Sequence, residues 1–226
     1  METAVQAPEE APLVAESCHA ASKGLDSRAL GRAASNLGVA AIFFLALVFH
    51  SRQYGGLSDL IWMIGAALMG VLSLIRVPPK AALITFDSIL ATTLMMVTPL
   101  LMKAAPHLVT NRIITAIAIV VEFVGMIISE GARIYLGRRF GLLPANRGVV
   151  STGPFAIVRH PIYLGWFVLS VGFVMAYPTP RNLALLLITL PCMIWRIALE
   201  ERLLGQDPAY RAYLESTRYR VIPWIY

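Results

Sequence analysis

Long runs of apolar residues, separated by short polar or proline-containing segments, dominate the chain. We expect helices at about 34–50, 57–75, 81–102, 111–134, 161–178 and 182–204. A run of roughly 20 apolar residues is long enough to cross the hydrocarbon core of a bilayer as a helix. These runs lack the strict alternation of transmembrane barrel strands. The pattern therefore predicts an all-α fold, a multi-pass membrane bundle of about six transmembrane helices.

The polar segments divide the chain into three parts. We expect a disordered cytosolic tail at 1–30, with no signal peptide, and transmembrane helices over 31–134. The remainder, 135–226, holds a polar loop, a helix hairpin and a polar C-terminal tail. Prolines at 78, 79, 106, 144, 161, 178 and 180 fall at or near the predicted junctions, where helix breakers belong.

Composition and charge support this interpretation. The chain is 58% hydrophobic and 14% charged, whereas soluble domains carry about a quarter charged residues. With the N-terminus inside, most of the 19 Lys and Arg residues lie on the cytoplasmic side; the exceptions are Arg52, Lys103, Arg112 and Arg181. The net charge of +6 is thus explained by membrane orientation, and we expect no nucleic-acid partner. Cys18 and Cys192 provide no disulfide framework, and we expect no metal site.

The chemistry-bearing residues lie in the C-terminal half. The stretch Arg159-His160-Pro161-Ile162-Tyr163 opens the fifth predicted helix, and Arg196, Glu200 and Glu201 close the sixth. Each set has an ordinary structural explanation: an interfacial anchor for Arg159 and His160, an ion pair four residues apart for Arg196 and Glu200, and a solvated charge for Glu201. The short turn at 177–181 predicts an antiparallel hairpin, which would bring the two sets face to face.

Two acidic residues, Glu122 and Glu130, occur in the fourth predicted span. An acidic side chain at membrane depth is costly and indicates a functional site by default. Glu130 could equally lie at the membrane surface. Both interpretations remain open from the sequence.

From about residue 136 to the C-terminus, the chain resembles the isoprenylcysteine carboxyl methyltransferase family and the related phospholipid N-methyltransferases. The shared pattern is Gly153-Pro154-aromatic, then Arg159-His160-Pro161-x-Tyr163-x-Gly165, then Arg196-x-x-x-Glu200-Glu201, then Tyr210-x-x-Tyr213 and a basic and apolar ending. Phe155 stands where many relatives have tyrosine. Residues 140–146 do not align convincingly, so we assign no contact there. The first spans carry no readable family signal.

The resemblance implies methyl transfer from S-adenosyl-L-methionine at the cytosolic membrane face. It implies that the cofactor contacts Arg147, Gly148, Val149, Val150, Phe155, His160, Pro161, Ile162, Tyr163 and Glu200. Arg196 would be the catalytic residue near the substrate. A fixed guanidinium can hold a carboxylate with two hydrogen bonds, and aromatic faces attract a sulfonium.

We therefore expect a methyltransferase of a bacterial inner membrane, with its active site facing the cytoplasm. The favoured reaction is O-methylation of the carboxylate of a prenylcysteine-like or other lipophilic substrate, which enters from the membrane lipids. One alternative is a phospholipid N-methyltransferase, in which a lipid amine is methylated. The other is a non-catalytic membrane transporter or structural protein, which would bind no cofactor.

Overall fold

The computed structural model describes residues 33–45, 47–48, 57–105 and 111–225. The predicted tail at 1–30 lies outside the described residues. An apolar helix at Ala33–Leu45 comes first. It is followed by α2 Leu57–Ile75, β1 Ala81–Ala82, α3 Phe86–Leu101, α4 Arg112–Leu136, the 3-10 turn η2 Gly137–Arg139, β2 Ala145–Asn146, the 3-10 turn η3 Gly153–Ala156, α5 Pro161–Ala176, α6 Pro180–Leu204 and α7 Pro208–Ser216.

Local sequence sets the helix ends. Asn111 caps α4 by accepting from the backbone nitrogens of Ile113 and Ile114. Three helices, α5, α6 and α7, begin at a proline. A proline costs nothing at the first helical position, because its missing N–H would have no partner there. The prolines that mark the predicted junctions therefore also start the helices that follow.

Helices occupy all six predicted runs within the described residues, and one boundary is wrong. The third helix begins at Phe86 instead of 81. Ala81 and Ala82 pair with Asn146 and Ala145 in a short antiparallel ladder. Thr85 then caps α3 in a reciprocal arrangement with Ser88. The apolar composition of 81–85 hides this strand, because its partner lies more than 60 positions away.

The outer surface of the bundle is apolar. Along α4, the side chains of Ile113, Val120 and Ile134 are 71%, 61% and 62% exposed. Soluble proteins rarely expose such continuous apolar area. Among the described helices, those at Arg112–Arg139 and Pro180–Leu204 are long and apolar enough to cross a bilayer, and the other apolar helices are shorter. These features describe a helical membrane protein with two candidate spans.

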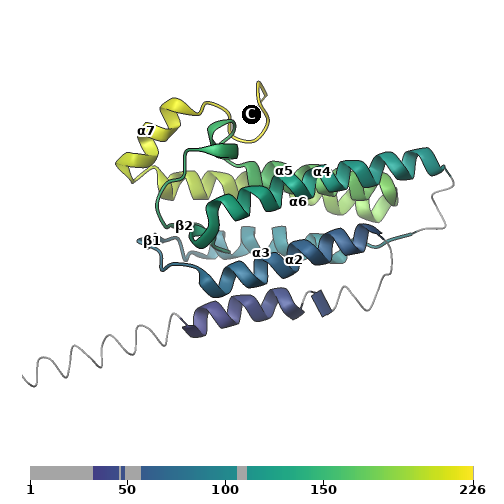
Figure 1. The fold of residues 1–226 in the computed structure, drawn as a ribbon, viewed down its shortest axis with the longest axis horizontal. Coiled ribbons are helices and arrows are strands. Elements are labelled where there is room, and N and C mark those ends of the chain that lie inside the picture. Colours follow the sequence, from purple (N-terminus) through teal and green to yellow (C-terminus); the bar gives the residue numbers. More distant parts are fainter. Residues whose placement is uncertain (1–32, 46, 49–56, 106–110, 226) are drawn as a thin grey trace, which may run out of the picture.

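The helices lie side by side, with β1, β2 and α7 at one end (Figure 1). We call this the loop end. The β1–β2 ladder joins the α2–α3 connection to the long α4–α5 connection. Both connections therefore lie at the same end of the bundle, where the positive residues of the two segments also gather.

Glycines bring the backbones of α4 and α5 into direct contact. A Cβ atom on Gly125 would overlap the backbone nitrogen of Leu169, and one on Gly165 would overlap that of Ser129. A Cβ on Gly172 would lie 2.6 Å from the backbone nitrogen of Glu122. Small residues at a helix interface allow such close approach, which is a common packing mode in membranes. This contact holds the C-terminal end of α4 against the start of α5.

We predict that Gly165→Ala and Gly125→Ala destabilise the protein by about 1–3 kcal/mol, because the added methyl group overpacks the helix interface. Gly131→Ala is the matched control, since no atom lies within 4 Å of a Cβ at this α4 position. It should stabilise the helix by about 0.5–1 kcal/mol. Thermal unfolding in detergent measures all three, and equal stability of Gly165→Ala and Gly131→Ala would contradict the packing described.

Candidate functional site

A cavity of about 130 Å³, partly open to solvent, lies at the loop end. Residues of α2, α3, α4, α5, α6, α7 and the long loop line it. Ten of the sequence-predicted site residues line it: Arg147, Gly148, Val149, Val150, Phe155, His160, Ile162, Tyr163, Arg196 and Glu200. The structure thus brings nearly the whole predicted set around one space.

Pro161 is the predicted contact that the structure does not place in the cavity wall. It is buried and forms the first residue of α5. Its ring fixes the backbone where the loop becomes a helix. The proline therefore orients its neighbours His160 and Tyr163 and is not itself exposed to the cavity.

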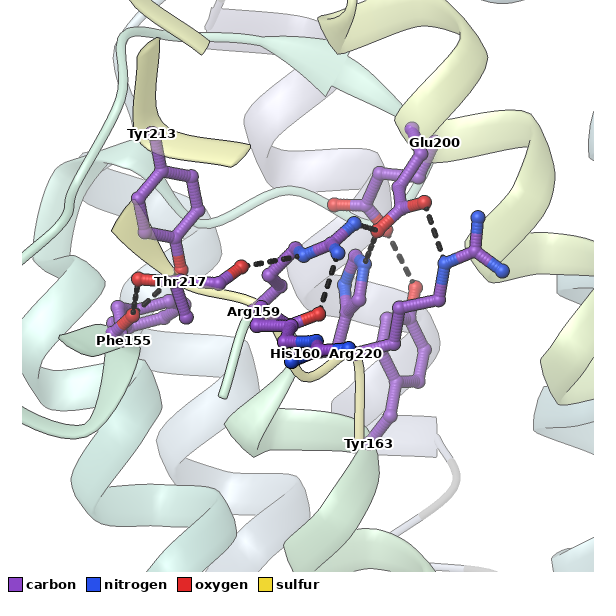
Figure 2. Close-up of polar contacts among 10 residues, drawn as sticks. Phe155, Arg159, His160, Tyr163, Glu200, Tyr213, Thr217 and Arg220 are labelled. Atoms are coloured by element: carbon purple, nitrogen blue, oxygen red, sulfur yellow. Dashed lines mark hydrogen bonds and ion pairs between the residues drawn. The ribbon is translucent and has the colours of Figure 1, made fainter. Parts of the chain in front are cut away.

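A short hydrogen-bonded chain links the two helices of the hairpin. The Tyr163 hydroxyl donates to Oε2 of Glu200 at 2.8 Å and accepts from Nε of Arg196 at 2.6 Å. Figure 2 shows Tyr163 and Glu200 directed toward one another. The Tyr163 hydroxyl thus links Arg196 to Glu200. The sequence suggested a direct ion pair between these two side chains, and the structure has this bridge instead.

The guanidinium of Arg196 is buried, and each of its nitrogens has a partner. Besides Tyr163, it donates to the Thr92 hydroxyl on α3 and to the Leu142 carbonyl in the loop. Its side chain also lies 5.9 Å from the centre of the Tyr163 ring. Arg196 therefore ties α3, α5 and the loop together at the cavity wall.

Glu201 carries the densest set of ionic contacts in the described structure. Its Oε1 lies 2.9 Å from Nη1 of Arg159 and 3.3 Å from Nε2 of His160, and its Oε2 lies 2.8 Å from Nε of Arg220. The Glu201 side chain is only 10% exposed. A solvated end-of-helix charge is thus the wrong description of this residue. Arg159, His160 and Arg220 converge in Figure 2 from the loop and the C-terminal tail.

The C-terminal tail pairs with the segment that precedes α5. The backbone nitrogens of Arg159 and His160 donate to the carbonyls of Tyr219 and Arg220 at 2.9 and 2.8 Å. The Tyr213 hydroxyl donates to the Phe155 carbonyl at 2.6 Å (Figure 2). The tail thereby closes one side of the site.

The loop and tail around the cavity also show perturbed acidities. Burial raises the pKa of Tyr213 to about 12 and raises that of Tyr210 further. Burial lowers the pKa of Arg147, and the nearby Arg76 acts in the same direction. The hydrogen bond from Asn146 holds the pKa of Asp207 below its usual value. Both tyrosines therefore keep their hydroxyl protons at neutral pH.

Sequence reasoning missed part of the cavity wall. Residues 140–143, to which no contact was assigned, line it, as do Met69, Met95, Met96 and Arg133. Tyr210 and Tyr213 also line it, and the Tyr-x-x-Tyr pattern was a signal that could have identified them. The methionines carry no such signal, since their spacing is ordinary for a membrane helix.

The two intramembrane acids have separate surroundings. Glu122 is fully buried and accepts a hydrogen bond of 2.9 Å from Ser58. Glu130 is largely buried and forms an ion pair with Arg133, so it does not lie free at the surface. Among the described residues, no group of three or more His, Cys, Asp or Glu could hold a metal ion.

Comparison with known proteins bears on the segment that builds this site. Residues 126–206 match the model of the isoprenylcysteine carboxyl methyltransferase (ICMT) family. No curated protein matches the chain. The matched segment includes the end of α4, the long loop, α5, α6 and therefore Tyr163, Arg196 and Glu200. Through residues 126–206, which surround the cavity, the chain is similar to the isoprenylcysteine carboxyl methyltransferase family.

Proposed function

We propose that the protein is a membrane methyltransferase that uses S-adenosylmethionine to methylate the carboxylate of a lipophilic, prenylcysteine-like substrate. The observation that carries this proposal is the convergence of the family segment on one cavity with a polar and an apolar side. The name of the matched family gives the reaction class, which is methyl transfer to a carboxylate. The cavity wall must then offer groups that can bind S-adenosylmethionine.

The cavity wall offers groups that fit the polar parts of such a cofactor. The hydroxyl of Tyr210 is buried and has no hydrogen-bond partner within the described chain. Buried polar groups nearly always have partners, so an unpartnered one at a cavity wall indicates a ligand. Glu200 uses Oε2 for Tyr163, and its second oxygen can accept from ribose hydroxyls or an ammonium group. Tyr163 and Phe155 add aromatic surface that favours a sulfonium.

The opposite wall suits a lipophilic acceptor. Met69 of α2 and Met95 and Met96 of α3 line the cavity at this side. Methionine side chains adapt to irregular apolar ligands. The outer surfaces of these helices are apolar, so an acceptor dissolved in the bilayer can approach from the side without crossing water.

The chemistry makes modest demands on the protein. When bound, S-adenosylmethionine supplies an electrophilic methyl group, which passes to a carboxylate oxygen of the acceptor and leaves S-adenosylhomocysteine. A carboxylate is already the nucleophile, so no general base is required. The protein holds the acceptor oxygen in line and excludes water, and such positioning supplies much of the rate enhancement. Tyr163, fixed between Arg196 and Glu200, and the loop segment at His160 provide the rigid wall for this alignment.

The proposal includes an orientation. The loop end carries the positively charged connections, which favour the cytoplasmic side of a membrane. The six apolar helices would then all cross the bilayer, the shorter ones with local thinning or flanking residues that reach the interface. In a bacterial host, this places the cavity at the cytoplasmic face of the inner membrane.

Glu200→Gln should weaken the binding of S-adenosylhomocysteine by about 10- to 100-fold, because a charged acceptor is lost from the polar side of the cavity. Glu215→Gln is the matched control, since Glu215 is an exposed carboxylate on α7. Calorimetric titration of the detergent-purified proteins measures both affinities. Parent-like affinity in folded Glu200→Gln protein would remove Glu200 from the cofactor site.

Tyr210→Phe and Tyr213→Phe should separate binding from stability. Removing the unpartnered hydroxyl of Tyr210 should weaken S-adenosylhomocysteine binding and leave the unfolding temperature unchanged or higher. Removing the Tyr213 hydroxyl breaks its bond to the Phe155 carbonyl and should cost about 1 kcal/mol of stability. Thermal unfolding and calorimetry check both. Lower stability with intact binding in Tyr210→Phe would contradict the assignment.

Methyl transfer itself tests the acceptor class. The purified protein, with labelled S-adenosylmethionine, should form a base-labile methyl ester on N-acetyl-S-farnesylcysteine. It should not label phosphatidylethanolamine vesicles offered under the same conditions. Label that appears in lipid amines, without ester formation, would replace carboxyl methylation by phospholipid N-methylation. Absence of both products and of cofactor binding would favour a non-catalytic membrane protein.

A further inference from the structure

A buried ion pair on α4 is incompletely satisfied. Glu130 and Arg133 pair through Oε1 and Nη1, and their side chains are 12% and 6% exposed. The other carboxylate oxygen of Glu130 and Nε of Arg133 are both buried without a hydrogen-bond partner among the described residues. An ion pair of this kind adds little stability, because desolvation offsets its attraction. Stability therefore does not explain why this ion pair is buried with two unpartnered atoms.

The position of this pair supplies one. Arg133 lines the cavity. Glu130 packs against α2 at Gly65: a Cβ atom added to this glycine would lie 3.2 Å from Oε1 of Glu130. Met69 lies one helical turn beyond Gly65 and lines the same cavity. Arg133 therefore lies where the methionine side of the cavity meets the side formed by α5.

Four other arginines line the cavity: Arg139, Arg147, Arg159 and Arg196. Two of them have all of their guanidinium nitrogens committed to the protein. Arg196 donates from all three nitrogens to Tyr163, Thr92 and Leu142. Arg159 likewise donates from all three, to Thr217, Glu201 and Arg218. Binding of a carboxylate by either residue would require breaking contacts that hold the site together. In Arg133, the buried Nε has no hydrogen-bond partner among the described residues.

We infer that Arg133 binds the carboxylate of the acceptor, with the apolar chain of the acceptor lying along Met69, Met95 and Met96. The inference rests on the proposed function, which requires a carboxylate-bearing lipid. A guanidinium forms charge-assisted hydrogen bonds with a carboxylate, and the unpartnered Nε of Arg133 can donate one of them. Arg196 then holds Tyr163 and the loop in place, and its own donors stay with the protein.

Steady-state kinetics with N-acetyl-S-farnesylcysteine, beside calorimetry with S-adenosylhomocysteine, tests Arg133. Arg133→Gln should raise the acceptor KM by about 10- to 100-fold, the loss of a charged hydrogen bond. Its affinity for S-adenosylhomocysteine should stay within about twofold of the parent value, and Arg133→Lys should recover part of the KM.

Two further variants separate binding from folding. Glu130→Gln keeps the guanidinium and should keep a parent-like KM, whereas a purely structural ion pair predicts equal defects in Glu130→Gln and Arg133→Gln. The double variant Glu130→Gln/Arg133→Gln removes both buried charges together, so it should fold even if Arg133→Gln does not, and its KM should be raised. Arg138→Gln is the matched control, because Arg138 lies outside the cavity wall; its KM should not change.

The outcomes distinguish this inference from the proposed function. Parent-like acceptor KM in folded Arg133→Gln or in the double variant overturns the role of Arg133 and leaves carboxyl methylation standing. Loss of S-adenosylhomocysteine binding in the double variant, in step with acceptor binding, also overturns it, since the residue would then support the whole cavity. If the parent protein forms no ester on the farnesylcysteine probe, the proposed function fails and this inference with it.

Discussion

The carboxylate of Glu201 holds together the loop, α6 and the C-terminal tail at the loop end of the bundle. Arg159, His160 and Arg220 come from segments that are far apart in the sequence, and each lies within 3.3 Å of this one side chain. A largely buried carboxylate with several charged donors is costly to break, because removing one partner leaves an uncompensated charge. The cavity depends on this cluster, since the loop and the tail form two of its walls (Figure 2).

The glycine contact between α4 and α5 fixes how the two helices are positioned along each other at the site. With Gly125 and Gly165 in backbone contact, the end of α4 brings Arg133 level with the start of α5, where Tyr163 lies. The cavity therefore has a polar side made by the family segment and an apolar side made by α2 and α3. Under the proposed function, a methyl acceptor that is apolar along its length and anionic at its reactive end would lie between them.

The sequence predicted the helices, and it predicted that the segment from Arg159 to Tyr163 faces the segment from Arg196 to Glu201, because long apolar runs joined by a short turn form a hairpin. It did not predict the strand at 81–82, whose partner lies in the distant loop, nor the contacts of residues 140–143. Glu201 shows the limit most clearly. Its neighbour Glu200 was assigned by family pattern, but Arg159, His160 and Arg220, which surround Glu201, come from segments whose approach only the folded chain reveals.

Hydrogen–deuterium exchange of the detergent-purified protein, with and without S-adenosylhomocysteine, tests most directly whether the loop, α6 and the tail enclose one ligand site. The account predicts that the ligand slows exchange together in residues 147–163, around 196–204 and in 210–221. Exchange in the outer helix at 33–45 should not change. Unaltered exchange in all these segments, or protection confined to one of them, would contradict the shared cavity.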